Sequence, residues 1–456
     1  MVDIPKIKIK INDFRAIKSA DIILNGITVL AGINGCGKST ISKLLYNSIK
    51  TAIEFEKIVK ENLFDELRDI RPFLEELSHE VEIFYRENKE FKKKDLKDDF
   101  EIGFKFNRLF YFNSAMDLKE QENKILASID YYIKTLSELP LEFKKEERYR
   151  IRLYRLERFF KEEFFEKNKN PKNIDILILL DKLKDNIKKR FQQAYSNIEN
   201  RPIVLLDNII NDYFSEEIDV NNFEIEELGA LITNRTNKKL SNFLTINKVA
   251  YIDTPMIVGV ENIEDNNVQH WQDLDILLKN KGVNLNKKRR ISALLKNEII
   301  DGETEYDNKS ENFVYNRKDG FSVELLSCAT GLKSFSLLQI LYNNGFLDNK
   351  TLLILDEPEA HLHPEWVVQY ARLIVMLHKE LKVNFLIGSH NPDMVMAIKY
   401  IAKKELEIGS KAVNFYLAKE SVKYRFDYKL IETDIEPIFK SFNASLDNIS
   451  KYGASE

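Results

Sequence analysis

One run of residues limits the fold of this chain more than any other feature: Gly32-Ile33-Asn34-Gly35-Cys36-Gly37-Lys38-Ser39-Thr40. It follows an apolar stretch typical of a β-strand, 27–30, and precedes a helical pattern from 41 to 49. Glycines between a strand and a helix let the backbone curl, so that successive N–H groups point inward at phosphate oxygens. The run therefore predicts a phosphate-binding loop within an α/β fold.

Side chains of this loop have the chemistry that a nucleotide and its metal ion require. Lys38 can reach the outer phosphates, and the Ser39 hydroxyl is placed to bind Mg²⁺. A glycine-rich turn that matches the pattern by chance is the alternative for the loop taken alone. The residues of this loop that we expect to contact the nucleotide are Asn34, Gly35, Cys36, Gly37, Lys38, Ser39 and Thr40.

A second motif, at 351–358, is an apolar run that ends in two carboxylates, Asp356 and Glu357. A continuous apolar run is typical of a strand buried on both faces, and ligands of open α/β sheets bind at the carboxyl ends of strands. We expect Asp356 to hold Mg²⁺ and Glu357 to polarise the attacking water. The alternative is a pair of surface acids after a core strand.

Two further segments have the pattern of ligand-binding loops. The strand expected at 384–387 is followed by His390, which we expect to contact the γ-phosphate; a purely structural histidine is the alternative. Small and hydroxyl residues at 326–334 precede a helix expected at 337–344, and such a helix N-terminus attracts anions. An ordinary helix cap is the alternative for that segment.

The chain of 456 residues divides into regions of different character. Strand and helix patterns alternate in 1–50 and again in 246–430, whereas 51–245 is dense in Lys and Glu with aromatics at helical spacing. We therefore expect one discontinuous nucleotide-binding domain, 1–50 and 246–430, a helical insertion domain, 51–245, and a C-terminal helix or tail, 431–456. Pro140, Pro171 and Pro202 favour separate helices in the insertion over a long coiled coil.

Composition restricts the compartment and the partners. The net charge is −4, so any nucleic-acid surface must be a local patch. Two cysteines fit a reducing compartment, and neither a signal peptide nor a membrane-length apolar run is visible. These features predict a cytoplasmic protein with no membrane partner.

Two basic stretches are candidates for contacting nucleic acid or a protein partner. Arg148, Arg152 and Arg155 share one face of an expected helix, and 287–290 reads Lys-Lys-Arg-Arg. Acidic residues are interleaved with the first stretch, so a solvated, salt-bridged helix is the alternative there. A solvated turn is the alternative for the second.

In chain order, these segments resemble the ATP-binding-cassette (ABC) ATPases of the RecF/SMC/OLD type. That group's Walker A loop, Gly-x-Asn-Gly-x-Gly-Lys-Ser/Thr, matches 32–39, and its opening strand and turn are similar to 11–15, which end at Arg15. The OLD-like Walker B, Asp-Glu-Pro-Glu-x-His-Leu-His-Pro, matches 356–364, and His390 fits the switch histidine. The signature segment, 326–335, departs from Leu-Ser-Gly-Gly, since Ala329 stands where serine is expected.

The resemblance implies an ABC-ATPase head: a mixed, mostly parallel sheet flanked by helices, which hydrolyses ATP to ADP and phosphate with Mg²⁺. It also implies a head-to-tail dimer or higher homo-oligomer, in which ATP lies between the Walker motifs of one copy and the signature segment of another. Arg15, Thr330, Gly331 and Lys333 are then nucleotide contacts. Cys36 and Cys328 would both line the composite site.

Within the group, the sequence motifs at 329–335, 363–366 and 389–395 are similar to those of the ATPase subunits (PtuA-like) of Septu and retron anti-phage systems. This implies a sensor or regulator that controls a partner nuclease in trans, of the HNH type, and that responds to DNA or a phage-derived trigger. Only 66 residues follow His390, too few for a toprim nuclease domain. A DNA repair or recombination ATPase of the RecF/SMC type is the main alternative, followed by a scaffold that binds ATP without turnover and a transporter subunit.

Overall fold

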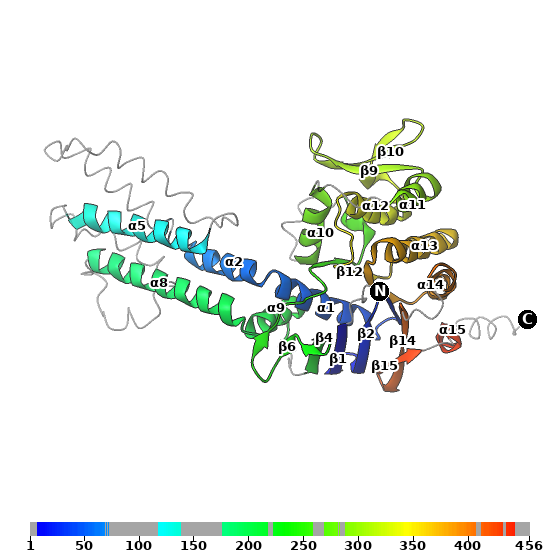
Figure 1. The fold of residues 1–456 in the computed structure, drawn as a ribbon, viewed down its shortest axis with the longest axis horizontal. Helices are drawn as coiled ribbons and strands as arrows, with labels where there is room; N and C mark the ends of the chain where they lie inside the picture. The colour runs from blue at the N-terminus through cyan, green and yellow to red at the C-terminus, as the bar shows by residue number, and fades with distance from the viewer. Residues whose placement is uncertain are drawn as a thin grey trace, which may run out of the picture. The chain divides into compact units, whose positions relative to one another are not determined.

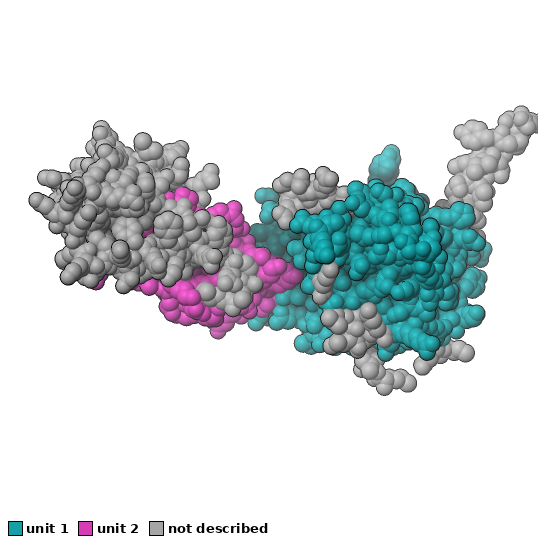
Figure 2. Space-filling view, turned by 90° about the horizontal axis from the view of Figure 1, so that it is seen from above, with its two compact units in different colours: residues 1–53, 202–456 teal, residues 54–201 magenta. Residues whose placement is uncertain are grey.

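The computed structural model describes residues 7–68, 70, 72, 117–137, 176–217, 222–258, 269–280, 282, 288–406, 412–431 and 435–442. The chain forms two compact units, which Figure 2 shows in different colours. The first contains residues 1–53 and 202–456, and the second contains 54–201. No helix within the described ranges is long and apolar enough to cross a membrane.

A ten-stranded sheet is the centre of the first unit, with the order β5-β4-β1-β2-β15-β14-β3-β13-β12-β8 (Figure 1). Its strands are β1 (Ile7–Phe14), β2 (Ile17–Leu24), β3 (Ile27–Ala31), β4 (Phe223–Glu227), β5 (Ala230–Leu231), β8 (Lys248–Ile252), β12 (Thr351–Asp356), β13 (Asn384–Ser389), β14 (Val413–Val422) and β15 (Arg425–Ile431). The predicted fold class, a mixed, mostly parallel sheet flanked by helices, is confirmed.

Five consecutive strands of this sheet, β14, β3, β13, β12 and β8, run parallel. Ala31 at the end of β3 pairs with Ser389 at the end of β13, and Asp356 at the end of β12 pairs with Gly388. On the other side of β12, Leu355 pairs with Ile252 at the end of β8. The segments that follow these four strands therefore all start at the same edge of the sheet.

Helices cover both faces of the parallel region. Leu353 and Leu355 belong to a core that α12 (Thr330–Asn343), α13 (Pro364–Leu381) and α14 (Pro392–Glu405) share. The alternate residues Leu352 and Ile354 point to the opposite face. There α1 (Lys38–Ile53) contacts β8, β12 and β13, and α9 (Val204–Phe214) contacts α1.

The remaining elements of the first unit lie around this framework. They are α10 (Gln269–Lys279), α11 (Arg289–Ala293), α15 (Glu436–Phe442), the short helices η7 (Pro255–Ile257), η9 (Leu294–Ile299) and η10 (Leu325–Ser327), the hairpin of β6 (Thr233–Asn234) and β7 (Lys239–Leu240), and a three-stranded sheet of β9 (Gly302–Asp307), β10 (Asn312–Arg317) and β11 (Ser322–Glu324). The short helix α15 lies in the region where we expected a C-terminal helix or tail.

In the second unit the described residues form three helices, α2 (Phe55–Leu67), α5 (Leu118–Ser137) and α8 (Ile176–Asn200). Helix α8 contacts both α2 and α5. Its apolar side is buried through Leu183, Ile187 and Phe191, and Phe64 of α2 packs edge-on against Phe191. The basic face expected at Arg148, Arg152 and Arg155 lies outside the described residues.

The unit boundary differs from the expected insertion, 51–245, because residues 202–245 belong to the first unit. Strand β4 pairs antiparallel with β1 and extends the sheet. Its sequence, Phe-Glu-Ile-Glu-Glu, alternates in burial, but its charges match the composition of the insertion. Those charges are neutralised across the strands, since Lys10 of β1 lies 3.1 Å from Glu224 and 2.7 Å from Glu226.

We expect Glu227 to be a stability determinant of this added strand. Its side chain is buried, and its oxygens accept hydrogen bonds from the backbone N–H groups of Leu244 (2.6 Å) and Thr245 (3.0 Å). Glu227→Ala should lower the free energy of unfolding by roughly 1–3 kcal/mol, because it leaves these donors without a partner. Urea denaturation measures the change.

The matched control is Glu224→Ala on the same strand, whose side chain is two-fifths exposed and should leave the unfolding midpoint almost unchanged. Equal midpoints for the two variants would contradict the role assigned to Glu227.

Candidate functional site

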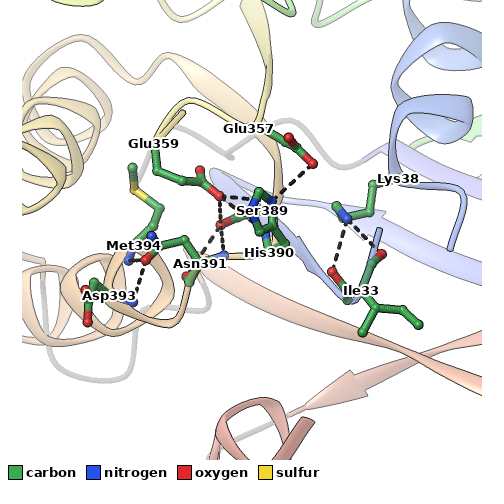
Figure 3. Close-up of polar contacts among 10 residues, drawn as sticks. Ile33, Lys38, Glu357, Glu359, Ser389, His390, Asn391, Asp393 and Met394 are labelled. Atoms are coloured by element: carbon green, nitrogen blue, oxygen red, sulfur yellow. Dashed lines mark hydrogen bonds and ion pairs between the residues drawn. The ribbon is translucent and has the colours of Figure 1, made fainter. Parts of the chain in front are cut away.

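The phosphate-binding loop connects β3 to α1 and has the backbone that its glycines allow. Gly35 (φ 80°) and Gly37 (φ 99°) lie in the left-handed region, which side chains rarely adopt. A Cβ atom at Gly37 would lie 2.8 Å from Ile17 Cγ1, so the close approach to β2 also requires glycine. Lys38 Nζ donates hydrogen bonds to the carbonyl oxygens of Gly32 (3.0 Å) and Ile33 (3.1 Å) (Figure 3).

A cavity of about 320 Å³ lies above this loop. It brings together the loop, the turn after β1 and the end of β12, which are far apart in the sequence. Arg15 at its rim is held by Glu216 (2.6 Å) and lies over the ring of Phe214, 4.5 Å from the ring centre. The lining residues are Arg15, Ala16, Asn34, Gly35, Gly37, Lys38, Ser39, Thr40 and Glu357.

Cys36 is the one predicted loop residue that does not line the cavity. Its side chain is fully buried, with Sγ 3.6 Å from the hydroxyl of Tyr428 on β15. The Tyr428 hydroxyl also donates to the carbonyl oxygen of Cys36 (3.2 Å). Cys36 therefore has only its backbone available to a phosphate, and Tyr428, which the sequence did not indicate, fixes the loop to the sheet.

Asp356 has the surroundings of a metal ligand. Its Oδ2 accepts a hydrogen bond from Tyr251 (3.2 Å), while its Oδ1 is buried without a partner. Burial raises the pKa of Asp356, against the effect of hydrogen bonds from Ser39 and Tyr251. A free carboxylate oxygen beside a serine hydroxyl matches the oxygen ligands that Mg²⁺ prefers, so these two residues fit the ion.

Glu357 and His390 lie at ion-pair distance, with 3.1 Å between Glu357 Oε1 and His390 Nδ1 (Figure 3), but the geometry is not that of a hydrogen bond. Both side chains are about two-fifths exposed. Glu357 has a left-handed backbone (φ 48°), which its N–H stabilises by donating to the carbonyl oxygen of Gly388 (2.8 Å). Strained backbone of this kind concentrates at functional sites.

Glu359 joins the turn after β12 to the end of β13. Its Oε1 accepts hydrogen bonds from Ser389 Oγ (2.7 Å) and from the backbone N–H of His390 (3.2 Å) (Figure 3). Burial raises the pKa of this carboxyl group, and the hydrogen bond from Ser389 opposes that shift. The position of Glu359 inside the Walker B pattern was the only sequence signal for it.

The signature segment does not join this cavity within one chain. Thr330, Gly331 and Lys333 lie in the first turn of α12, and none of them lines the cavity. A Cβ atom at Gly331 would lie 2.7 Å from the ring of Trp366, so this glycine is needed for packing. Lys333 is buried, with only 4% of its surface exposed.

Several solved structures are similar to this chain. The Smc head domain of Pyrococcus furiosus, bound to the C-terminal domain of ScpA, has 10% identity and a TM-score of 0.32, with 98% of this chain and 100% of that chain covered. The SmcHead bound to the C-winged helix domain of ScpA has 10% identity and a TM-score of 0.36 over 94% of this chain and 98% of that chain. The SMC head domain of Thermotoga maritima has 14% identity and a TM-score of 0.28 over 46% and 65%.

None of the curated proteins compared with the chain matches it. The family described as an AAA ATPase domain matches residues 6–395, which is most of the 456-residue chain. The chain therefore belongs to the AAA ATPase domain family.

Proposed function

We propose that this chain binds ATP with Mg²⁺ in the cavity above the phosphate-binding loop and hydrolyses it to ADP and phosphate. One observation carries the proposal: parallel pairing brings Lys38, Asp356, Glu357 and His390 to one edge of the sheet. Lys38 and the loop N–H groups bind the phosphates, and Ser39 and Asp356 hold the ion. Mg²⁺ supplies charge neutralisation at the transferring phosphate.

Glu357 is the general base of this proposal. Its carboxylate lines the cavity and can accept a proton from a water that attacks the γ-phosphate. His390, 3.1 Å from Glu357, orients that carboxylate and is placed to contact the γ-phosphate. Arg15 at the rim and the main chain of Asn34 to Thr40 complete the contacts to the nucleotide.

The active unit of this proposal is a head-to-tail dimer or higher homo-oligomer. The exposed residues Ser327 and Ala329 lie just before α12, yet neither they nor the first turn of α12 line the cavity of their own chain. A second copy can supply Thr330 and the positive N-terminus of α12 to the γ-phosphate. Gly331 and Lys333 are buried in their own chain, so in this proposal they act only through the shape of this turn.

For the biological role, we propose an ATP-driven sensor or regulator in prokaryotic anti-phage defence, which controls an HNH-type nuclease encoded nearby. This proposal is supported by the sequences of the Walker B, switch and signature segments, which resemble those of the ATPase subunits of Septu and retron systems. The second unit, 54–201, is then a dock for the nuclease, for DNA or for a phage-derived trigger. The alternative role is DNA repair or recombination of the RecF/SMC type.

The first test separates nucleotide binding from hydrolysis. We expect Lys38→Ala to lose ATP binding, because it removes the cation that faces the phosphates. Glu357→Gln should keep ATP binding and lower turnover by roughly 10²–10⁴-fold, since a positioned general base contributes that much. Binding of a fluorescent ATP analogue and phosphate release measure the two steps.

Glu365→Gln, an exposed carboxylate in the first turn of α13, is the control and should behave as wild type. Wild-type turnover in Glu357→Gln would refute the assignment of the base.

The second test is a mixing experiment for the composite site. Ala329→Glu places a negative charge at the exposed N-cap of α12, where it suits the helix but repels a γ-phosphate. In a mixed dimer with Lys38→Ala, one site has both lesions and the other has neither. When the two variants are mixed in equal amounts, roughly half of the dimers are mixed, and each mixed dimer has one intact site of its two. We therefore expect the mixture to show roughly a quarter of wild-type turnover.

The control is Ala329→Gln, which introduces a side chain of the same size as glutamate but without its charge. This variant should hydrolyse ATP when it is tested by itself. A dead mixture whose two variants demonstrably co-assemble would exclude the composite site.

The third test addresses the biological role. We expect cells that carry this chain with its neighbouring nuclease to lose protection from phage when Glu357→Gln is introduced, because the switch can no longer complete its cycle. Plaque counts measure protection. Normal protection with Glu357→Gln, together with sensitivity to DNA damage when the gene is deleted, would favour the repair role instead.

A further inference from the structure

Tyr251 connects the metal-binding carboxylate to the interior of the first unit. It lies on β8, where it pairs with Ile354 of β12, two residues before Asp356. Its side chain is 1% exposed, and its hydroxyl donates to Asp356 Oδ2 (3.2 Å). Because side chains alternate along strands, Tyr251 and Asp356 project from the same face of the sheet.

Packing alone does not explain why a hydroxyl group is present at the buried position of Tyr251. A phenylalanine would fill the same space without burying a polar group, and a buried hydroxyl is unfavourable unless it is hydrogen-bonded. A tyrosine hydroxyl is protonated at neutral pH, and beside a carboxylate oxygen it donates its hydrogen. With Oδ2 engaged, Asp356 Oδ1 is the oxygen left without a partner, beside Gly388 and Lys38.

A network centred on buried His270 holds Tyr251 in place. The ring of His270 lies 4.6 Å from the ring of Tyr251, tilted by 34°. His270 Nε2 lies 2.9 Å from Asp253 Oδ2, and its Nδ1 lies 2.7 Å from the Tyr213 hydroxyl. Trp271 Nε1 donates to the other oxygen of Asp253 (2.8 Å).

The proton positions in this network follow from the chemistry of its members. Burial opposes ionisation of Asp253, but hydrogen bonds from His270 and Trp271 outweigh it and lower the pKa of that carboxyl group. An ionised carboxylate can only accept, so His270 Nε2 donates to Asp253. The Nδ1 atom is engaged by the Tyr213 hydroxyl, so contacts at both ring nitrogens fix the orientation of the imidazole.

We propose that Tyr251 is a positioning residue of the ATPase: its hydroxyl, braced by His270, aims Asp356 Oδ1 at the ion that Ser39 also binds. The inference rests on the proposed function, since it concerns the same metal. Partners that orient a metal ligand from behind typically change metal affinity by about 10–100-fold when removed. Tyr251 therefore sets the Mg²⁺ requirement of the nucleotide site without touching nucleotide or ion.

The test titrates Mg²⁺ into the full chain with a fluorescent ADP analogue, so that no turnover is needed. We expect Tyr251→Phe to bind the analogue in EDTA as the wild type does, and to need about 10–100-fold more Mg²⁺ for the half-maximal effect. A merely structural role would weaken binding in EDTA as well, or lower the unfolding midpoint without moving the Mg²⁺ titration.

Tyr46→Phe is the matched control. Tyr46 is equally buried and its ring lies 5.9 Å from the ring of Tyr251, but its hydroxyl donates to Asp273 rather than to Asp356. This variant should titrate as wild type. An Mg²⁺ requirement in Tyr251→Phe equal to that of Tyr46→Phe would overturn the inference.

His270→Asn is the second variant, and it decides the outcome if Tyr251→Phe fails to fold. Asn retains a donor for Asp253 but removes the ring that braces Tyr251, so the Mg²⁺ requirement should again rise. If His270→Asn needs no more Mg²⁺ than the wild type does, His270 does not hold Tyr251 in position. If instead the wild type binds the analogue equally well with and without Mg²⁺, the proposed metal site itself is wrong, which is a separate failure.

Discussion

Parallel pairing of β14, β3, β13, β12 and β8 is the constraint on which the rest of the structure depends. Carboxyl ends of parallel strands meet at one edge, so the backbone ladder alone brings together the glycine-rich loop at 32–40, the carboxylates Asp356 and Glu357, and His390. The register of the strand pairing matters as much as the parallel direction of the strands. The pairing of Asp356 with Gly388 allows the N–H of Glu357 to donate to the Gly388 carbonyl oxygen (2.8 Å) and holds Glu357 in its left-handed backbone.

Buried carboxylates at this edge are held by hydroxyl and amide donors rather than by cations. Asp356 accepts from Tyr251, and Glu359 accepts from Ser389 and the backbone of His390. Burial of such groups is unfavourable, and one oxygen of each remains without a partner. Such incomplete satisfaction suits groups that meet a ligand, and the same hydrogen bonds connect strands β8, β12 and β13 across the site.

Sequence patterns predicted the parallel core well, since β3, β12 and β13 are short apolar runs bounded by polar turns. They failed for three other strands of the sheet, β4, β14 and β15. Strand β4 carries three glutamates, and these charges favour the helical insertion in the sequence pattern. In the structure two of them pair with Lys10, on a strand about 215 residues away in the chain, and the third, Glu227, is buried and accepts backbone hydrogen bonds. Strands β14 and β15 were not predicted, because charged residues occupy the exposed half of their hairpin.

The sequence by itself determined the chemistry of the site: the glycines at 35 and 37, the lysine and serine that follow, and the carboxylates at 356 and 357. These groups act through local backbone geometry and side-chain identity, which short patterns encode. Tertiary structure alone decided which distant residues meet. It placed Tyr251 behind Asp356, Tyr428 behind the phosphate loop and the first turn of α12 away from the cavity of its own chain. Such contacts depend on strand order and helix packing, which join segments that no local pattern relates.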